Sequence, residues 1–341
     1  MNSEERIIKA IRHEEIDRVP TFEWLISNNV IQALYPGDTI DDFIYHMGID
    51  AVCPDLDYET VKIDDTNFRD EWGMIKRYSA EEHSVPVSGP IKTMEDLNRY
   101  IPPEPRKPSR YKTLEAKLER HRGQKAVILH LNDVFSLPSR LMTFEDFMVA
   151  ISEEPELVEG LIDLTVEVNL QMAKEAVKRG VKIIYTGDDY AYNSGPMMSP
   201  RAFEQIFAPR LKKVMQGYKD LGLYVIKHCD GNIMTIIDLM VDSGIDCLDP
   251  IDPVAGMDLA HIKKKYGKRI AIKGNVDCAG TLTFKSVEET VEETKNCLRI
   301  AAPGSGYILS SSNSIHSRVK PENFKAMIDT VLKYGTYPIN V

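Results

Sequence analysis

From residue 125 onward, short apolar runs alternate with longer segments in which apolar residues recur at helical spacing. The spacing predicts helices at 155–179, 200–221, 233–243, 258–266, 286–300 and 321–335, with one more opening at 143–146. Glycine ends most of these helices, and a short run with strand composition follows after one or a few residues. Such a regular alternation of helix and strand is typical of a repeated βα architecture.

The N-terminal part contributes an amphipathic helix at 3–13 and another helix at 39–47. Candidate strands begin near residues 19, 50, 125, 182, 223, 245, 270 and 306. Eight short, apolar strands separated by helices favour a parallel sheet closed into a (β/α)8 TIM barrel over a doubly wound sheet. No GxGxxG follows the first strand and no P-loop is present, which removes the usual nucleotide-binding folds. We therefore predict one barrel domain over 1–341 with an N-terminal helical extension.

Residues 57–108 do not follow this alternation of helix and strand. Residues 61–64 and 72–78 alternate polar and apolar side chains at period two, which favours an antiparallel β-hairpin structure. Pro102, Pro103, Pro105 and Pro108 then form a connection that regular structure cannot accommodate. We interpret 57–108 as an insertion near the barrel mouth.

Composition narrows the class of protein. Hydrophobic residues make up 43 % of the chain and charged residues 28 %, which is typical of a globular protein. The net charge of −10 gives no reason to expect binding to nucleic acid or to an anionic membrane, and no apolar run could span a bilayer. The five scattered cysteines and the charged N-terminus indicate a reduced, cytoplasmic protein. The sequence is compatible with a homodimer and does not decide the oligomeric state.

Polar residues follow the predicted strands, and in a barrel the carboxyl ends of all strands share one mouth. His228, Cys229 and Asp230 follow the strand at 223–226, and Asp188 and Asp189 follow the strand at 182–186. Other polar residues near strand ends are Glu23, Trp24, Asn132, Asp133, Tyr190, Tyr192, Asp249, Asp252, Asn275, Asp277, Ser310–Asn313 and His316. Some of these are helix caps or turn formers, and Asp230 as a cap beside a core His228 is the simplest structural alternative.

Several motifs resemble the uroporphyrinogen decarboxylase superfamily. They are Arg12 with Glu15–Pro20, Gly187–Asp189 continuing through Ser194–Pro200, His228–Asn232, and Lys273–Asp277. The resemblance extends over nearly the whole chain and implies a (β/α)8 barrel with its site at the carboxyl ends of the strands. Three activities occur in that superfamily.

The decarboxylase itself holds the acetate groups of a porphyrinogen with an arginine-rich segment after the first strand. Residues 22–29 of this chain contain no arginine and include the acidic Glu23. A pocket for a polyanion without guanidinium groups is physically implausible, so we do not expect porphyrinogen decarboxylation. A lyase acting on a smaller acid remains a further alternative.

A second branch transfers a methyl group from a methylcobamide to a thiol such as coenzyme M. The resemblance implies a zinc site built from an HxC pair and a later cysteine, where zinc lowers the pKa of the thiol. This chain has Asp230 in place of the expected cysteine, and the late strand ends in Ser310–Asn313 without a thiol. If zinc is bound, its candidate ligands are His228, Asp230 and Cys278.

The third branch moves a methyl group from a methyl ether to Co(I) of a separate corrinoid protein, and the His228–Asn232 variant resembles it most. We therefore predict the methyltransferase component of an O-demethylase, without an obligatory metal, acting on a small methoxy donor of the aryl methyl ether kind and on a corrinoid carrier protein. His228 is the expected proton donor, oriented by Asp230 or Asp189, with Asp188 as a further catalytic candidate. Candidate substrate-binding residues are Phe22, Trp24, Asn132, Phe135, Tyr190, Tyr192, Asn275 and Asn313.

Overall fold

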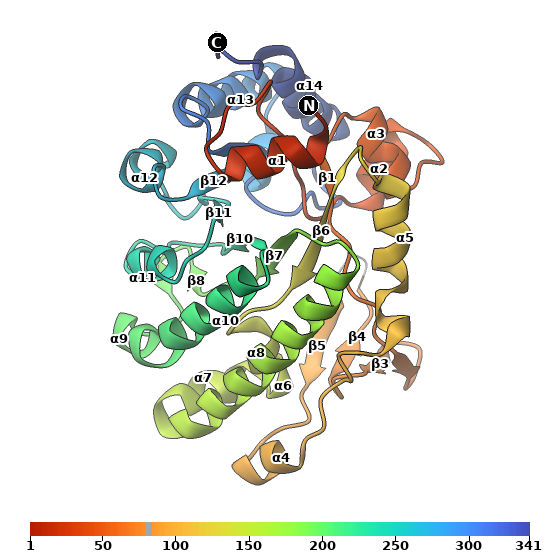
Figure 1. Ribbon diagram of the computed structural model, residues 1–341, viewed down its shortest axis with the longest axis vertical. Helices are drawn as coiled ribbons and strands as arrows, with labels where there is room; N and C mark the ends of the chain where they lie inside the picture. The colour runs from red at the N-terminus through yellow and green to blue at the C-terminus, as the bar shows by residue number, and fades with distance from the viewer. Residues whose placement is uncertain (80–83) are drawn as a thin grey trace.

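The computed structural model describes residues 1–79 and 84–341, and a seven-stranded parallel sheet organises it (Figure 1). Its strands, in spatial order, are β1 (Ala51–Val52), β6 (Ala126–Leu131), β7 (Ile183–Gly187), β10 (Tyr224–His228), β11 (Cys247–Asp249), β12 (Ala271–Val276) and β13 (Tyr307–Ser311). Each strand therefore lies beside its successor in the βα repeat. This arrangement confirms the predicted α/β class and the parallel sheet.

The first predicted strand differs from expectation. Residues 19–25 form no regular strand, although an isolated parallel bridge joins Thr21 to Leu309 of β13. The backbone N–H of Phe22 donates to Leu309, and the N–H of Asp50 donates to Thr21. Residues 20–22 thus connect the two outer strands of the sheet in place of the eighth strand. Pro20 lacks an N–H group, which is one reason why the ladder here stays short.

Helices surround the sheet, most of them on its outside (Figure 1). They are α1 (Ser3–Ile11), α2 (Asn28–Leu34), α3 (Ile40–His46), α4 (Met94–Arg99), α5 (Lys112–His121), α6 (Ser136–Leu141), α7 (Phe144–Glu153), α8 (Pro155–Lys178), α9 (Pro200–Ala202), α10 (Ala208–Asp220), α11 (Ile237–Asp242), α12 (Leu259–Tyr266), α13 (Val287–Ala301) and α14 (Pro321–Tyr334). A 3₁₀ turn at Pro108–Tyr111 and π-helical turns at Phe203–Phe207 and Cys278–Leu282 complete the regular structure. No helix in the described ranges has the length and apolarity needed to cross a bilayer.

Capping side chains explain several helix starts. Ser286 accepts from the N–H of Glu289, whose carboxylate accepts from the N–H of Ser286, so the predicted capping box opens α13. Thr143 caps α7 through the N–H of Asp146, also as predicted. The helix predicted at 233–243 begins only at Ile237, because the Asn232 side chain accepts from the N–H of Met234 and forms a turn first.

One apolar cluster fills the space enclosed by the strands. It combines side chains from successive strands with Phe22 and with Ile7, Ala10 and Ile11 of α1. Strand residues in this cluster include Ala51, Ile128, Tyr185, Ile226, Cys247, Ala271 and Ile308. Helix α1 therefore packs on the interior of the sheet, which leaves the carboxyl ends of the strands as the open end.

An antiparallel sheet of four strands occupies part of the predicted insertion. Its strands are β2 (Thr60–Lys62), β3 (Asn67–Asp70), β4 (Ile75–Arg77) and β5 (Val85–Ser88). The predicted alternation at 61–64 and 72–78 corresponds to parts of β2 and β4. A short antiparallel pair, β8 (Ala191–Tyr192) and β9 (Gly195–Pro196), lies after β7.

Candidate active site at the carboxyl ends of the strands

Strand register brings the chemical groups together. His228 is the last residue of β10, where it pairs with Gly187 of β7 on one side and with Asp249 of β11 on the other. Asp189 lies two residues beyond Gly187, and Asp230 lies two residues beyond His228. Because parallel strands end at the same level, these side chains converge at one edge of the sheet.

His228 lies between carboxylates on both of its ring nitrogens. Nδ1 is 2.7 Å from Oδ2 of Asp249, whereas Nε2 is 3.5 Å from Oδ1 of Asp189 and 3.4 Å from Oδ1 of Asp230. The predicted grouping of His228 with Asp189 and Asp230 is thus present. Asp249 fixes the ring from behind, so Nε2 is the nitrogen that faces the two outer carboxylates.

These carboxylates determine the protonation of the ring. Burial alone would lower the pKa of His228, but Asp230 and Asp249 outweigh it and raise the pKa well above the ordinary value. Burial also acts to raise the pKa of Asp249, yet Lys273 and His228 hold that pKa below its usual value. The pair is therefore a protonated imidazolium next to an ionised carboxylate.

A buried network supports Asp249. Its Oδ1 accepts from Nζ of Lys273 at 2.8 Å, and its Oδ2 accepts from the hydroxyl of Tyr185 at 2.9 Å. Asp249 and Lys273 are 1 % and 3 % exposed, respectively. Lys273 and Tyr185 are not among the residues predicted for the site. A lysine inside the apolar strand 270–276 was the available signal, since lysine is almost never fully buried unless it is paired.

Glu23 lies on the far side of this network. Its carboxylate accepts from the backbone N–H of Ser311 at 2.8 Å and contacts the Ser311 hydroxyl at 2.6 Å. Burial raises the pKa of Glu23 to about 7, against the opposing effect of Lys273. A chamber of about 10 Å³, enough for one water molecule, is lined by Glu23, Lys273 and His228 among others.

In front of His228 lies a cavity of about 580 Å³, here named the mouth cavity. Asp189, His228, Asp230 and Asn313 line one part of it, and the antiparallel sheet lines another through Phe68, Asp70, Lys76 and Pro86. Aromatic side chains of Trp24, Tyr58 and Trp72 also line the cavity. Its volume lies in the range of small-molecule sites.

The side chains of Asp189, His228 and Asp230 could also hold a metal ion. One ligand atom from each lies within 4.8 Å of the others, and Oδ1 of Asp230 is buried without a hydrogen bond within the described part of the chain. The contact of Asp249 with Nδ1 is the arrangement that commonly orients a metal-binding imidazole. The donor set is therefore one nitrogen and two carboxylates.

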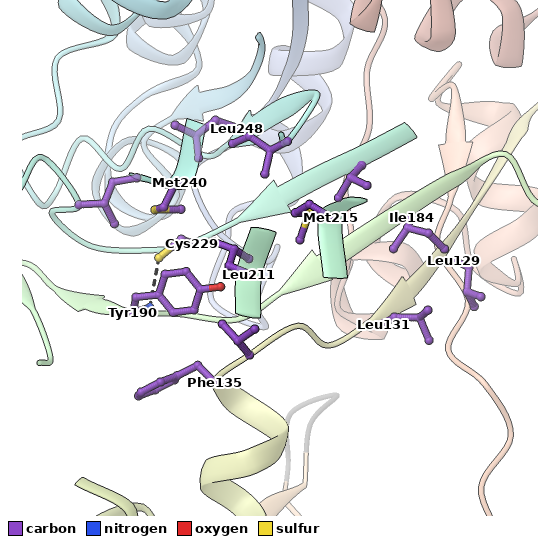
Figure 2. Packing of buried hydrophobic residues seen from close by; sticks show 14 of the residues in the cluster. Leu129, Leu131, Phe135, Ile184, Tyr190, Leu211, Met215, Cys229, Met240 and Leu248 are labelled. Carbon is purple, nitrogen blue, oxygen red and sulfur yellow. Dashed lines mark hydrogen bonds between the residues drawn. The ribbon is translucent and has the colours of Figure 1, made fainter. Parts of the chain in front are cut away.

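The cysteines contribute no thiol to this group. Cys229 Sγ accepts from the N–H of Tyr190 within the buried hydrophobic cluster, as Figure 2 shows, and burial raises its pKa. Cys278, a candidate zinc ligand, donates to the carbonyl of Ser314, and burial raises its pKa to about 12. Neither sulfur belongs to the group that could hold a metal.

Four of the predicted substrate-binding residues lie at the cavities. Trp24 lines the mouth cavity and packs against His130, with a ring distance of 4.7 Å, and against His228, at 6.2 Å. Asn132 lines the same cavity, and Asn313 donates to Oδ2 of Asp230 at 2.6 Å. Phe135 lines an adjoining cavity of about 350 Å³, here named the side cavity.

The structure places the other predicted residues elsewhere. Phe22 is fully buried in the interior core, and Asn275 donates to the carbonyl of Ile251. Tyr190 is fully buried and donates to Asp133, whereas Tyr192 is 54 % exposed beyond the cavity lining. The sequence shows that these residues lie near the ends of strands. It does not show in which direction their side chains point.

Asp188, predicted as a further catalytic residue, is fully buried. One of its carboxylate oxygens accepts from the backbone N–H groups of Asp133, Phe135 and Ser136. Asp188 therefore holds the loop that follows β6 and leads into α6. These contacts give it a structural role, distinct from that of its neighbour Asp189.

The family model of uroporphyrinogen decarboxylase (URO-D) matches residues 72–334. The chain belongs to this family. The match includes the strand ends that carry Asp189, His228 and Asp249, and it confirms the resemblance found in the sequence.

Two individual proteins of the family are similar to this chain in sequence. The chain is 26 % identical over 193 residues to methylcobamide:CoM methyltransferase MtaA of Methanosarcina barkeri, covering 57 % of this chain and 54 % of that protein. It is 22 % identical to uroporphyrinogen decarboxylase of Psychromonas ingrahamii, covering 74 % of this chain and 72 % of that protein. The chain thus spans about half the length of the methyltransferase that it matches.

Among solved structures, a methyltransferase from Methanosarcina mazei is similar, with a TM-score of 0.76 and 19 % identity. The similarity covers 98 % of this chain and 99 % of that one, which shows that the two share a fold.

Proposed function

We propose that this protein is a corrinoid-dependent methyltransferase, which moves a methyl group between a corrinoid carrier protein and a small molecule bound in the mouth cavity. Sequence similarity to a methylcobamide:CoM methyltransferase supports this activity over others in the family. The cavity itself argues against a porphyrinogen, because residues 22–29 supply no arginine and Asp55, Asp70, Asp189 and Asp230 line the walls.

One observation carries the proposal. Nε2 of His228 faces the mouth cavity between Asp189 and Asp230, while Asp249 and Lys273 fix the ring from behind. Methyl transfer to or from cobalt needs little covalent chemistry from the protein. It needs the small molecule in line with the cobalt and its heteroatom stabilised, and a rigidly held imidazole does the latter.

His228 would act on the heteroatom that gains or loses the methyl group. When an ether loses its methyl group to Co(I), the departing oxygen gains negative charge, and the protonated Nε2 donates a proton or a hydrogen bond to it. Asp249 keeps the ring in place, and Asn313 holds the carboxylate of Asp230 beside the ring. Each of these contacts is already made in the structure.

A divalent cation also fits the residues present. Asp189, His228 and Asp230 would hold it, with the hydrogen bond from Asp249 orienting the imidazole. When bound, the ion would lower the pKa of a substrate thiol and so generate the thiolate. The residues supply no thiolate ligand, so the site suits zinc or another ion that accepts nitrogen and oxygen donors.

Two directions of transfer follow from these alternatives. The MtaA match favours transfer from a methylcobamide to a small thiol, more than it favours the ether demethylation that the sequence suggested. The imidazolium of His228, together with the lack of a cysteine in the ligand group, favours demethylation of a methoxy compound. The thiol reaction is our first candidate, and ether demethylation is the second.

Absorbance spectroscopy of cobalamin tests both directions. The protein is mixed with methylcobalamin and a panel of thiols, and separately with Co(I) cobalamin and a panel of methoxyarenes. Loss of methylcobalamin with thiols, or its formation with methoxyarenes, supports the proposal and identifies the direction. The same reactions are repeated with a methylated or reduced corrinoid protein.

Metal analysis accompanies the kinetics. We expect about one bound zinc per chain if the thiol reaction is correct, and its loss in His228→Ala. The absence of methyl transfer in either direction, with free cobalamin and with a corrinoid protein alike, would refute the proposal. Release of CO2 from a small acid without any cobalamin would instead establish the lyase alternative.

A further inference from the structure

Arg140 stands at the junction of the two larger cavities. It lies in the last turn of α6, is exposed, and lines both the mouth cavity and the side cavity. Asp189, one of the two carboxylates beside Nε2 of His228, also lines both cavities. Arg140 therefore lines the same space that His228 faces.

The charge of Arg140 is not neutralised within the described chain. Among residues 1–79 and 84–341, no carboxylate forms an ion pair with it. Of the other cations on the wall of the mouth cavity, Lys76 already contacts Asp70 at 2.7 Å. The ring of His228 lies between the carboxylates described above. Among the described residues, Arg140 is thus a cation of the cavity wall that is available to a ligand.

The backbone around Arg140 is held firmly in place. The N–H of Ile91 donates to the carbonyl of Leu141 at 2.9 Å, which joins the chain after β5 to the end of α6. Gly89 makes this close approach because a Cβ there would lie 2.1 Å from the Leu141 oxygen. The insertion and the barrel are therefore joined at the residue next to Arg140, which fixes where its side chain starts.

We propose that Arg140 binds an anionic group, a carboxylate or a sulfonate, on the small molecule whose other end reacts at His228. This inference rests on the proposed methyl transfer and adds the chemical class of the substrate. A guanidinium presents two parallel N–H donors that match the two oxygens of such a group. The substrate is then an organic anion that spans the cavity between Arg140 and His228.

Electrostatics gives this arrangement a physical reason. Asp189 and Asp230 flank Nε2 of His228 and repel an anionic group from the reacting end of the cavity. Arg140, which lines the same cavity, attracts that group. The aromatic side chains of Trp24 and Tyr58 also line the cavity and accommodate the apolar body of the substrate. The cavity thereby orients an anionic substrate in one direction.

Calorimetric binding to pairs of compounds that differ only in charge tests the inference without turnover. The pairs are 2-mercaptoethanesulfonate against 2-mercaptoethanol, and 4-methoxybenzoate against 4-methoxybenzamide. We expect the unchanged protein to bind the anionic member of one pair about 10- to 100-fold more tightly than its neutral partner. Arg140→Gln should remove this difference, and Arg140→Lys should retain part of it.

Arg77→Gln is the matched control, since Arg77 is exposed on β4 and lies outside the lining of either cavity. It should keep the full preference for the anion. Equal binding of charged and neutral members by the unchanged protein would overturn the inference. An Arg140→Gln variant that stays folded by circular dichroism but keeps the preference would overturn it as well.

The two proposals fail in different ways. If cobalamin never exchanges a methyl group but the charge preference depends on Arg140, the anion site stands and the reaction assignment falls. If methyl transfer from free cobalamin proceeds equally in Arg140→Gln with charged and neutral substrates, the reaction stands and the anion site falls.

Discussion

Glu23 offers a sharp test of the electrostatics behind the site. Its carboxyl group is 5 % exposed, and burial raises its pKa to about 7 from the ordinary 4.5. The contacts of Ser311 also suit a neutral Glu23. The Ser311 hydroxyl lies 2.6 Å from Oε2 of Glu23 and 2.5 Å from the Asn313 carbonyl, and its single hydrogen serves only one of them. A protonated Glu23 donates to the hydroxyl and satisfies both contacts.

The sign of the effect follows from linkage. Because the folded protein holds this proton more tightly than the unfolded chain, the stabilisation is fully present below pH 4.5 and is lost as the pH rises through about 7. The difference between the pKa of 4.5 in the unfolded chain and about 7 in the folded protein corresponds to about 3 kcal/mol of unfolding free energy. Between about pH 5.5 and about pH 8, the expected loss of unfolding free energy from this one group is about 2 kcal/mol.

Glu23→Gln removes the titration and keeps the shape of the side chain. Urea unfolding of both proteins at about pH 5.5 and about pH 8 gives a difference between variant and parent at each pH, so any fixed cost of the substitution cancels. We expect the difference to shift by about 2 kcal/mol in favour of the variant at the higher pH. The exposed Glu153→Gln serves as control. A difference that does not change with pH would show that Glu23 is ionised throughout and that our account of the chamber is wrong.

Three further predictions concern the groups around the imidazole. Asp249→Asn leaves Lys273 buried without its partner, and urea unfolding should show a loss of about 3–5 kcal/mol; a loss below about 1 kcal/mol would contradict the buried pair. His228→Ala should lower methyl transfer by about 100-fold or more in the cobalamin assay while circular dichroism reports a folded protein; an unchanged rate would remove His228 from the chemistry. Cys229→Ala should leave the metal content measured by mass spectrometry unchanged, whereas Asp230→Asn should reduce it; the reverse pattern would favour a thiolate ligand.

Much of the architecture was predictable because local signals repeat along the chain. Helices that end at glycine and short apolar strands recur from residue 125 onward, and each repeat adds a strand beside the previous one. The start of the parallel sheet was harder to predict. Pro20 interrupts the first ladder, and the segment that follows turns Glu23 and Trp24 toward the site instead of continuing as a strand.

The candidate site was predictable to the extent that strand ends share one mouth. That rule selected His228, Asp189 and Asp230. It could not separate Asp189 from Asp188, since neighbouring residues after a strand point in different directions and only the fold decides which one faces the cavity. Lys273 lies within a strand, where an alternating pattern does not reveal that its side chain reaches Asp249.

Residues that line the cavities from segments far apart in the chain could not be predicted from the sequence. Arg140 comes from a short helix, and strands of the antiparallel sheet line the same mouth cavity, so the two segments come together only in the folded protein, where Gly89 packs against Leu141. No periodic pattern in the sequence predicts this contact between α6 and the antiparallel sheet. In the sequence, Arg140 is a single arginine with no helical or charge pattern around it, and nothing there marks it as a residue of the cavity wall.

The distribution of charge links the chemistry of His228 with the orientation of the substrate. Asp249 is balanced by Lys273, whereas Asp189 and Asp230 face the cavity without a lysine or arginine partner among the described residues. Two such carboxylates beside one nitrogen favour a positive species there, either a proton on Nε2 or a metal ion. The same negative charge excludes an anionic group from that end. An anionic substrate can then approach His228 only with its neutral, methyl-bearing or thiol end, and Arg140, which lines the same cavity, completes that selection.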